Sequence, residues 1–87
     1  MSLGKNTSGE VGKLFNRYFV ANRTLDDISL VEAELPDDAA VLRGLAARCR
    51  QESIIAFRAG YHTEGRRFEI LARQFNERAE KIDSRKA

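Results

Sequence analysis

The sequence predicts an all-α protein, a small bundle of three long helices and one short acidic helix. Apolar residues recur at intervals of three and four residues along most of the chain, the spacing that places them on one side of a helix. No stretch alternates between apolar and polar residues as a strand does. The chain has 87 residues, which allows a single domain. We expect this domain to span 9–83, after a flexible lead-in at 1–8 and before a frayed end at 84–87.

The first long helix is expected over 9–21. Its apolar stripe consists of Val11, Leu14, Phe15, Tyr18 and Phe19. A short acidic helix is expected at about 25–34, where Thr24 precedes two aspartates in the first turn and the helix dipole favours negative charge. Pro36 ends this segment, because a residue that precedes a proline is disfavoured in the α conformation.

The second long helix is expected over 37–60 and carries two apolar stripes. One is made mainly of small residues, which let a neighbouring backbone approach closely. Its members are Leu42, Leu45, Cys49, Ser53, Ala56 and Gly60. The other, about 100° away round the helix, consists of Ala47, Ile54, Phe57 and Tyr61. Two stripes predict that this helix packs against two neighbours and lies at the centre of the bundle.

The last long helix is expected over 64–82, after a connection at 60–65. Its apolar stripe is the most regular in the chain, and its opposite face alternates in charge. We expect this stripe to pack against the small-residue stripe of the preceding helix, with aromatic side chains of the first helix closing the core. The predicted core residues are Phe15, Phe19, Leu45, Cys49, Ala56, Phe68, Leu71, Phe75 and Ile82.

Charge divides the chain into two unequal halves. The total of 15 Lys+Arg and 13 Asp+Glu gives a net charge of +2, too small by itself to indicate a nucleic-acid or membrane partner. Residues 1–42 nevertheless carry a net −3 and residues 43–87 a net +5. The candidate acidic partner surface consists of Asp26, Asp27, Glu32, Glu34, Asp37 and Asp38. The candidate basic partner surface consists of Arg43, Arg50, Arg58, Arg66 and Arg67.

The residues that usually carry chemistry are scarce. The one histidine, His62, is expected in a solvated loop, and the one cysteine, Cys49, is expected in the core. One histidine and one cysteine cannot supply the four ligands of a structural zinc site. The aspartate pairs lack the spacing of a calcium-binding loop and fall at helix starts, where capping explains them. We therefore predict no catalytic residue, no metal site and no cofactor, and a protein that is not an enzyme.

The same composition predicts a cytoplasmic protein. A single cysteine forms no internal disulfide. No apolar run approaches the roughly 20 residues of a membrane span, and the start of the chain does not read as a signal peptide.

The second half of the chain resembles two families of helical modules. The run FNERAEKI at 75–82 resembles the end of the third helix of MIT domains. The spacing of Gly60, Ala72 and Ala79 is similar to that of the small residues in a tetratricopeptide unit. The resemblance covers about 60–82. MIT domains are three-helix bundles of about this size, so it implies a module that binds short helical peptides in a groove between helices.

The leading hypothesis is a non-enzymatic helical module that binds a protein or peptide and associates with itself as a homodimer. Self-association is expected because a core this small provides limited stability. One alternative is a small nucleic-acid-associated regulator that uses the Arg-rich second half. It is less favoured because Asp37 and Asp38 open the helix whose N-terminus would approach the phosphates. The other alternative is a structural subunit of a larger assembly.

Overall fold

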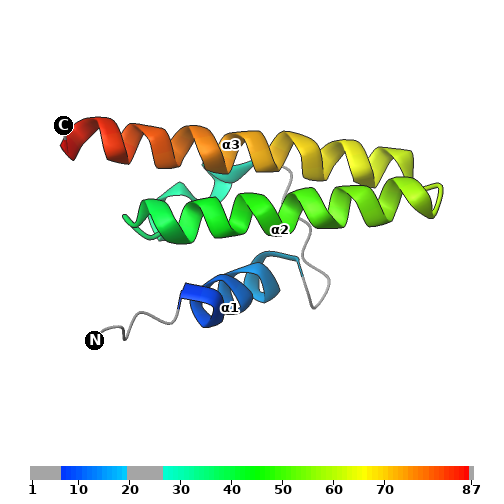
Figure 1. Ribbon diagram of the computed structural model, residues 1–87, viewed down its shortest axis with the longest axis horizontal. Helices are drawn as coiled ribbons and strands as arrows, with labels where there is room; N and C mark the ends of the chain where they lie inside the picture. Colours follow the sequence, from blue (N-terminus) through cyan, green and yellow to red (C-terminus); the bar gives the residue numbers. More distant parts are fainter. Residues whose placement is uncertain (1–6, 20–26, 87) are drawn as a thin grey trace.

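The computed structural model describes residues 7–19 and 27–86, and the long elements in these ranges are all helices (Figure 1). In chain order they are α1 (Thr7–Phe19), the 3-10 helix η1 (Ile28–Glu34), α2 (Ala39–Arg58) and α3 (His62–Lys86). No strand occurs within the described ranges. The prediction of an all-α fold is confirmed.

Helices α2 and α3 form an antiparallel hairpin that supports the rest of the molecule. Helix α1 packs against α2, and η1 packs against α3. Figure 1 shows that α1 ends near the middle of α2, whereas the hairpin continues well beyond it. The closed end of the hairpin therefore extends past the last described residue of α1.

Local hydrogen bonds define both ends of α2. The Asp38 carboxylate caps its N-terminus and accepts from the backbone N–H groups of Ala40 and Val41, at 3.0 and 3.4 Å. At the other end, Gly60 has a φ of +88°, and the Tyr61 N–H donates to the Ala56 carbonyl at 2.8 Å. This is a Schellman-type ending, which closes the helix on a glycine in the left-handed region. It makes the turn between α2 and α3 short.

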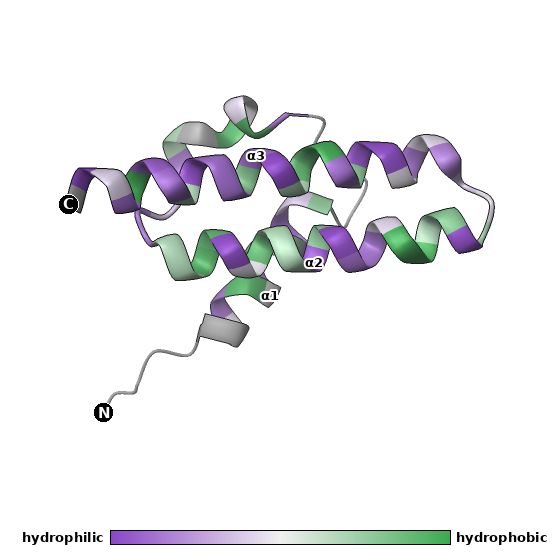
Figure 2. Cartoon of the chain, turned by 45° about the horizontal axis from the view of Figure 1, so that its top comes forward, coloured by the Kyte–Doolittle hydropathy of each residue, from purple (hydrophilic) through white to green (hydrophobic). Residues whose placement is uncertain are grey.

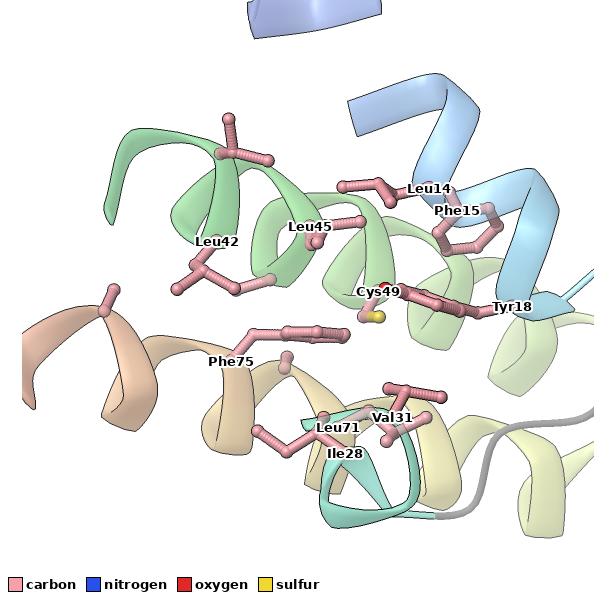
Figure 3. Close-up of a cluster of buried hydrophobic side chains, with 14 of the residues drawn as sticks. Leu14, Phe15, Tyr18, Ile28, Val31, Leu42, Leu45, Cys49, Leu71 and Phe75 are labelled. Atoms are coloured by element: carbon pink, nitrogen blue, oxygen red, sulfur yellow. The ribbon is translucent and has the colours of Figure 1, made fainter. Parts of the chain in front are cut away.

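The core lies where the four elements meet (Figure 3). Leu42, Leu45 and Cys49 of α2 are fully buried against Leu71 and Phe75 of α3. The side chains that close the core from α1 and η1 are Leu14, Phe15, Tyr18, Ile28 and Val31. All the predicted core residues are buried except Phe19 and Phe68, which are partly buried and pack against the core.

Helix α1 is held on α2 by a close approach at a glycine. A Cβ placed on Gly44 would lie 2.6 Å from Val11 Cγ2, so the valine occupies the space that a larger residue would fill. Further along, the Arg48 guanidinium lies 4.5 Å from the centre of the Phe15 ring, a cation–π distance. The rings of Phe15, Phe19 and Phe68 then form a cluster that links α1 to α3.

The second apolar stripe predicted for α2 is not buried, and this prediction is wrong. Ala47, Ile54 and Tyr61 are exposed, and Phe57 is partly buried. The second neighbour of α2 is α1, which lies on the face that carries Gly44 and Arg48 instead. Neither residue counts as part of an apolar stripe in the sequence. Gly44 nevertheless leaves space for Val11 of α1, and Arg48 covers the ring of Phe15.

Several expected boundaries also change. Helix α1 begins at Thr7, inside the expected lead-in, and α2 is two residues shorter at each end than expected. The acidic segment forms a 3-10 helix from Ile28, and its expected start at 25–26 lies outside the described residues. Helix α3 runs from His62 to Lys86. It therefore includes 62–65, which were expected in the connection, and 84–86, which were expected to fray.

The early start of α3 has a packing reason. A Cβ on Gly65 would lie 2.9 Å from the Phe57 ring, so this glycine makes room for an aromatic side chain of α2. The sequence predicts that Gly65 belongs to a loop, because glycine is common in turns. In the structure it is a buried contact inside a helix, and His62 lies in the first turn of that helix.

Candidate functional site

Large apolar side chains are exposed at the closed end of the hairpin. Among the described residues they are Ile54 (49% exposed), Ile55 (60%), Tyr61 (63%) and Ile70 (39%). All fall within 54–70, on the last turns of α2, the short turn and the first turns of α3. Figure 2 shows hydrophobic positions on the last turns of α2, in the part of the hairpin that extends past α1. We call these four residues the apolar tip.

Helix geometry explains why the core does not cover the apolar tip. Successive residues of a helix point about 100° apart, so Ile54 and Ile55 cannot both face α3. Tyr61 is held outside both helices by the hydrogen bond that closes the turn. Sequence reasoning assigned Ile54 and Tyr61 to a packed stripe and did not single out Ile55 or Ile70. The available signal was that Ile55 and Ile70 fall outside every apolar stripe of their helices.

A hollow of about 570 Å³ lies beside the apolar tip, on the first turns of α3. It is lined by His62, Thr63, Arg66, Arg67 and Ile70. Spacings of three and four residues place these side chains along one side of the helix. The lining combines two guanidinium groups with one exposed isoleucine and contains no carboxylate. We call this feature the tip hollow.

The candidate basic residues do not form one surface. Arg58, Arg66 and Arg67 lie at the closed end of the hairpin. Arg43 lies near the opposite end of α2, about 22 Å from Arg58 along the helix axis, and forms an ion pair with Asp83 of α3. Arg50 is exposed between the two ends. The structure therefore places three of the five predicted residues in the same part of the hairpin, near its turn.

Some of the candidate acidic residues form hydrogen bonds or ion pairs within the chain. Asp38 caps α2, and Asp37 forms an ion pair with Arg85 at 2.8 Å. The Asp27 carboxylate accepts from the Ser29 N–H at 2.9 Å, and this hydrogen bond lowers the pKa of Asp27. Glu34 is exposed. Asp26 and the side chain of Glu32 lie outside the part of the chain that the structure describes.

Some arginines of the hairpin form ion pairs within the chain and others do not. Arg43, Arg48 and Arg85 are paired with carboxylates of the same chain. No ion pair between described residues involves Arg58 or Arg66. The guanidinium groups of these two residues are exposed to solvent at the closed end.

Cys49 lies in the core between α1, α2 and α3 (Figure 3). Burial raises the pKa of its thiol to about 12; Glu52 adds to this effect, and Arg48 opposes it. The thiolate is the reactive form of cysteine, so this side chain is chemically inert at neutral pH. Within the described ranges, no three side chains of the His, Cys, Asp and Glu types converge as metal ligands would. No helix in those ranges has the length and apolarity needed to cross a membrane.

Comparison of the chain with protein-family models, with curated proteins and with solved structures finds no match. The resemblance of 60–82 to MIT domains and tetratricopeptide units stays a prediction. We therefore infer function from the surface geometry alone.

Proposed function

We propose that this protein is a non-enzymatic helical module that binds another protein, and that it makes contact through the closed end of the α2–α3 hairpin. In this proposal the partner binds to the closed end of the hairpin, and not in the groove between helices that the resemblance to MIT domains implied. We place the module in the cytoplasm, where a free thiol such as Cys49 persists in reduced form.

The exposure of the apolar tip is the observation that carries this proposal. Single apolar residues on a surface are ordinary, but a cluster of large ones with polar surroundings is typical of an interaction site. Here four such side chains fall within 54–70, on both helices and the turn of the hairpin. Tyrosine and arginine, both present at this end, are also enriched at the centres of protein interfaces.

The distribution of arginines favours a protein partner over a nucleic acid. A nucleic-acid surface needs several cations along the path of the phosphates. Arg43 and Arg85 are instead paired with Asp83 and Asp37 at the open end of the hairpin, and the N-terminus of α2 carries the capping carboxylate of Asp38. At the closed end, Arg66 lies beside the exposed Ile70, a combination that also occurs in protein interfaces.

Site-specific photocrosslinking in cells tests the proposal. A photoreactive phenylalanine analogue at position 61 should form discrete adducts with another protein, because Tyr61 is exposed in the turn of the proposed surface. The same analogue at Glu77, an exposed residue further along α3, serves as the matched control and should give none of these adducts.

The exposed isoleucines provide the second part of this test. Ile55→Gln should abolish the adducts from position 61 and leave the thermal midpoint within experimental error, because surface substitutions usually change stability by less than about 0.5 kcal/mol. Ala47→Gln, at an exposed position of α2 away from the tip, should leave the adducts intact. Identical adducts from positions 61 and 77, or adducts unaffected by Ile55→Gln, would contradict the proposal.

A further inference from the structure

We infer that the side of α2 that faces away from α3 binds an acidic amphipathic helix of the partner protein. This inference rests on the proposed function and specifies the chemistry of the partner. The surface lies on the last turns of α2, and all its members are exposed. They are Arg50, Gln51, Ile54, Ile55 and Arg58. We call them the outer α2 surface.

Helix geometry turns the outer α2 surface away from the core. Leu42, Leu45 and Cys49 are buried on the side of α2 that packs against α3. At 100° per residue, the five members lie about 100° to 180° round the helix from that side. Helix α1 covers the face that carries Gly44 and Arg48, and it ends near the middle of α2 (Figure 1). The five side chains therefore remain accessible on a rigid helix.

The charge of the outer α2 surface favours a partner with carboxylates. Glu52 is the one acidic residue of α2, and its carboxylate forms an ion pair with Arg48 at 3.3 Å. No ion pair between described residues involves Arg50 or Arg58. The surface therefore carries two positive charges and no negative one. A guanidinium presents a planar fork of donors that matches a carboxylate, so each arginine can bind one acidic side chain.

The spacing of these groups fits a helix that lies along α2. Arg50 and Arg58 are eight residues apart in the sequence, which corresponds to about 12 Å along the helix axis. Carboxylates seven or eight residues apart on a partner helix span nearly the same distance. Ile54 and Ile55 lie between the two arginines, 49% and 60% exposed, and can receive an apolar side chain. The expected partner pattern is acidic, apolar and acidic, with one helical turn between successive positions.

Other occupants fit the outer α2 surface less well. A nucleic acid needs several cations along its phosphates, whereas this surface offers two, and it would leave both isoleucines without an apolar contact. The same surface of a second copy of this chain would bring arginines against arginines, which is unfavourable.

The exposed faces of α3 are also less suited to an acidic ligand, because carboxylates offset their arginines. Glu64 and Glu69 lie in the same turns of α3 as the arginines of the tip hollow. A second hollow, of about 610 Å³, lies along the C-terminal part of α3, and its lining includes Glu77 and Glu80. Charges of both signs alternate there, which is typical of a solvated helix face.

Titration of the isotopically labelled full chain, followed by amide chemical shifts, tests this inference. The probe is a synthetic alanine-based peptide of about 18 residues, long enough to form a helix in water. It carries glutamate, leucine and glutamate at one-turn intervals on one side. One control peptide has lysine in place of glutamate, and another has the same residues distributed round the helix.

We expect the acidic amphipathic peptide to shift the amides of 50–58. It should bind at least about tenfold more tightly than either control peptide, because only this peptide presents carboxylates and an apolar side chain together. Its affinity should fall as salt is added.

Two charge-reversal variants separate the outer α2 surface from the general charge of the protein. Arg58→Glu should weaken binding of the acidic peptide about fivefold, the factor expected from the loss of one exposed ion pair. Arg73→Glu changes the net charge equally at an exposed position of α3 and should leave the affinity unchanged. Ile54→Ser should weaken binding without altering the salt dependence. Amide spectra of each free variant establish that it is folded.

Three results would overturn the inference. One is equal affinity for the acidic amphipathic peptide and either control peptide, and another is a set of shifted amides centred outside 50–58. The third is a stronger response of these amides to a single-stranded oligonucleotide than to the acidic peptide. Any of these results together with specific adducts from position 61 would leave the proposed protein-binding function in place and exclude an acidic helix on α2.

Discussion

Cys49 illustrates how much a single position in this protein depends on its surroundings. Its side chain contacts the core at the point where α1, α2 and α3 meet, and it is fully buried. Ser53, one turn further along α2, is also buried. Small side chains at these positions let α3 lie close to α2, as the small-residue stripe predicted.

Reactivity of Cys49 should report on the folded state. We expect an aromatic disulfide reagent to label the native protein slowly and the denatured protein rapidly, because the thiol is buried and its pKa is raised to about 12. Absorbance of the released thiolate follows the reaction. Rapid labelling under native conditions would place Cys49 at the surface and contradict the assigned core.

The same thiol should also make stability depend on alkaline pH. In the unfolded chain Cys49 loses its proton near its ordinary pKa of 9.0, whereas in the folded chain it keeps the proton until pH 12 is approached. The stabilising contribution is therefore complete below pH 9 and is lost as the pH rises towards 12. The free energy of unfolding should fall by about 1.4 kcal/mol per pH unit in this window.

Denaturant titrations between pH 8 and 11 measure this slope. Cys49→Ala removes the contribution while the tyrosines and lysines still titrate, so the alanine variant should have the shallower pH dependence. Equal slopes for the two proteins would contradict the assignment.

At the scale of elements, glycine has opposite effects on stability at different positions. Gly44 admits Val11 of α1, and Gly65 admits the ring of Phe57. Gly12, by contrast, lies within α1 with no atom within 4 Å of the position that a Cβ would take. Of these three helical glycines, two are therefore required by packing, and the third lowers helix stability without a compensating contact.

This difference predicts opposite effects of the same substitution. Gly12→Ala should stabilise the protein by roughly 0.5–1 kcal/mol, the difference in helix propensity. Gly44→Ala should destabilise it by about 1–3 kcal/mol, because the new methyl group overlaps Val11 and displaces α1 from α2. Thermal unfolding by circular dichroism measures both changes.

A second substitution tests the cause of the destabilisation. Val11→Ala removes the methyl groups that Gly44→Ala would meet, so the double variant should be less destabilised than the sum of the two single variants. Strict additivity would show that α1 does not pack at Gly44.

At the scale of the whole molecule, the unequal lengths of the helices determine which surface remains available. Helix α1 has 13 residues and α2 has 20, so α1 covers one part of the hairpin and ends before the turn. The apolar tip lies in the part that extends past the end of α1. Helix length, rather than any unusual residue, produces the proposed interaction surface.

A homodimer stays a proposal, and its salt dependence identifies the surface that forms it. Pairing of two apolar tips would bring Arg58, Arg66 and Arg67 of both copies together, so added salt should screen their repulsion and favour the dimer. We expect equilibrium sedimentation at micromolar concentration to give a monomer at low salt and a dimer fraction that grows with salt. Ile55→Gln should prevent this growth.

The opposite salt dependence would support the pairing expected from the sequence, in which the acidic segment of one chain meets arginines of another. Such a dimer should dissociate as salt is added. The ion pair between Asp37 and Arg85 and the cap at Asp38 already use part of that acidic segment within one chain, and for this reason we favour the tip.

Much of the fold could be predicted because helical periodicity is a local property. The stripe that contains Phe68, Leu71, Phe75, Ala79 and Ile82 repeats every three to four residues, and burying it against a stripe of small residues is the arrangement that removes it from water. The exposed tip could not be predicted in the same way. Ile54 belonged to a stripe of equally apolar residues, and whether a neighbour covers that stripe depends on where α1 lies.

The sequence by itself determined the helical class, the pairing of α2 with α3 and most of the buried residues, because each depends on apolar spacing within one segment. The tertiary structure alone decided which face of α2 receives α1, how far along the hairpin α1 extends and which arginines gather beside exposed apolar side chains. These features depend on contacts between distant segments, such as Val11 with Gly44 and Phe15 with Arg48. These contacts depend on the small size of a glycine and on the flat guanidinium of an arginine. Hydrophobic periodicity contains no information about either property.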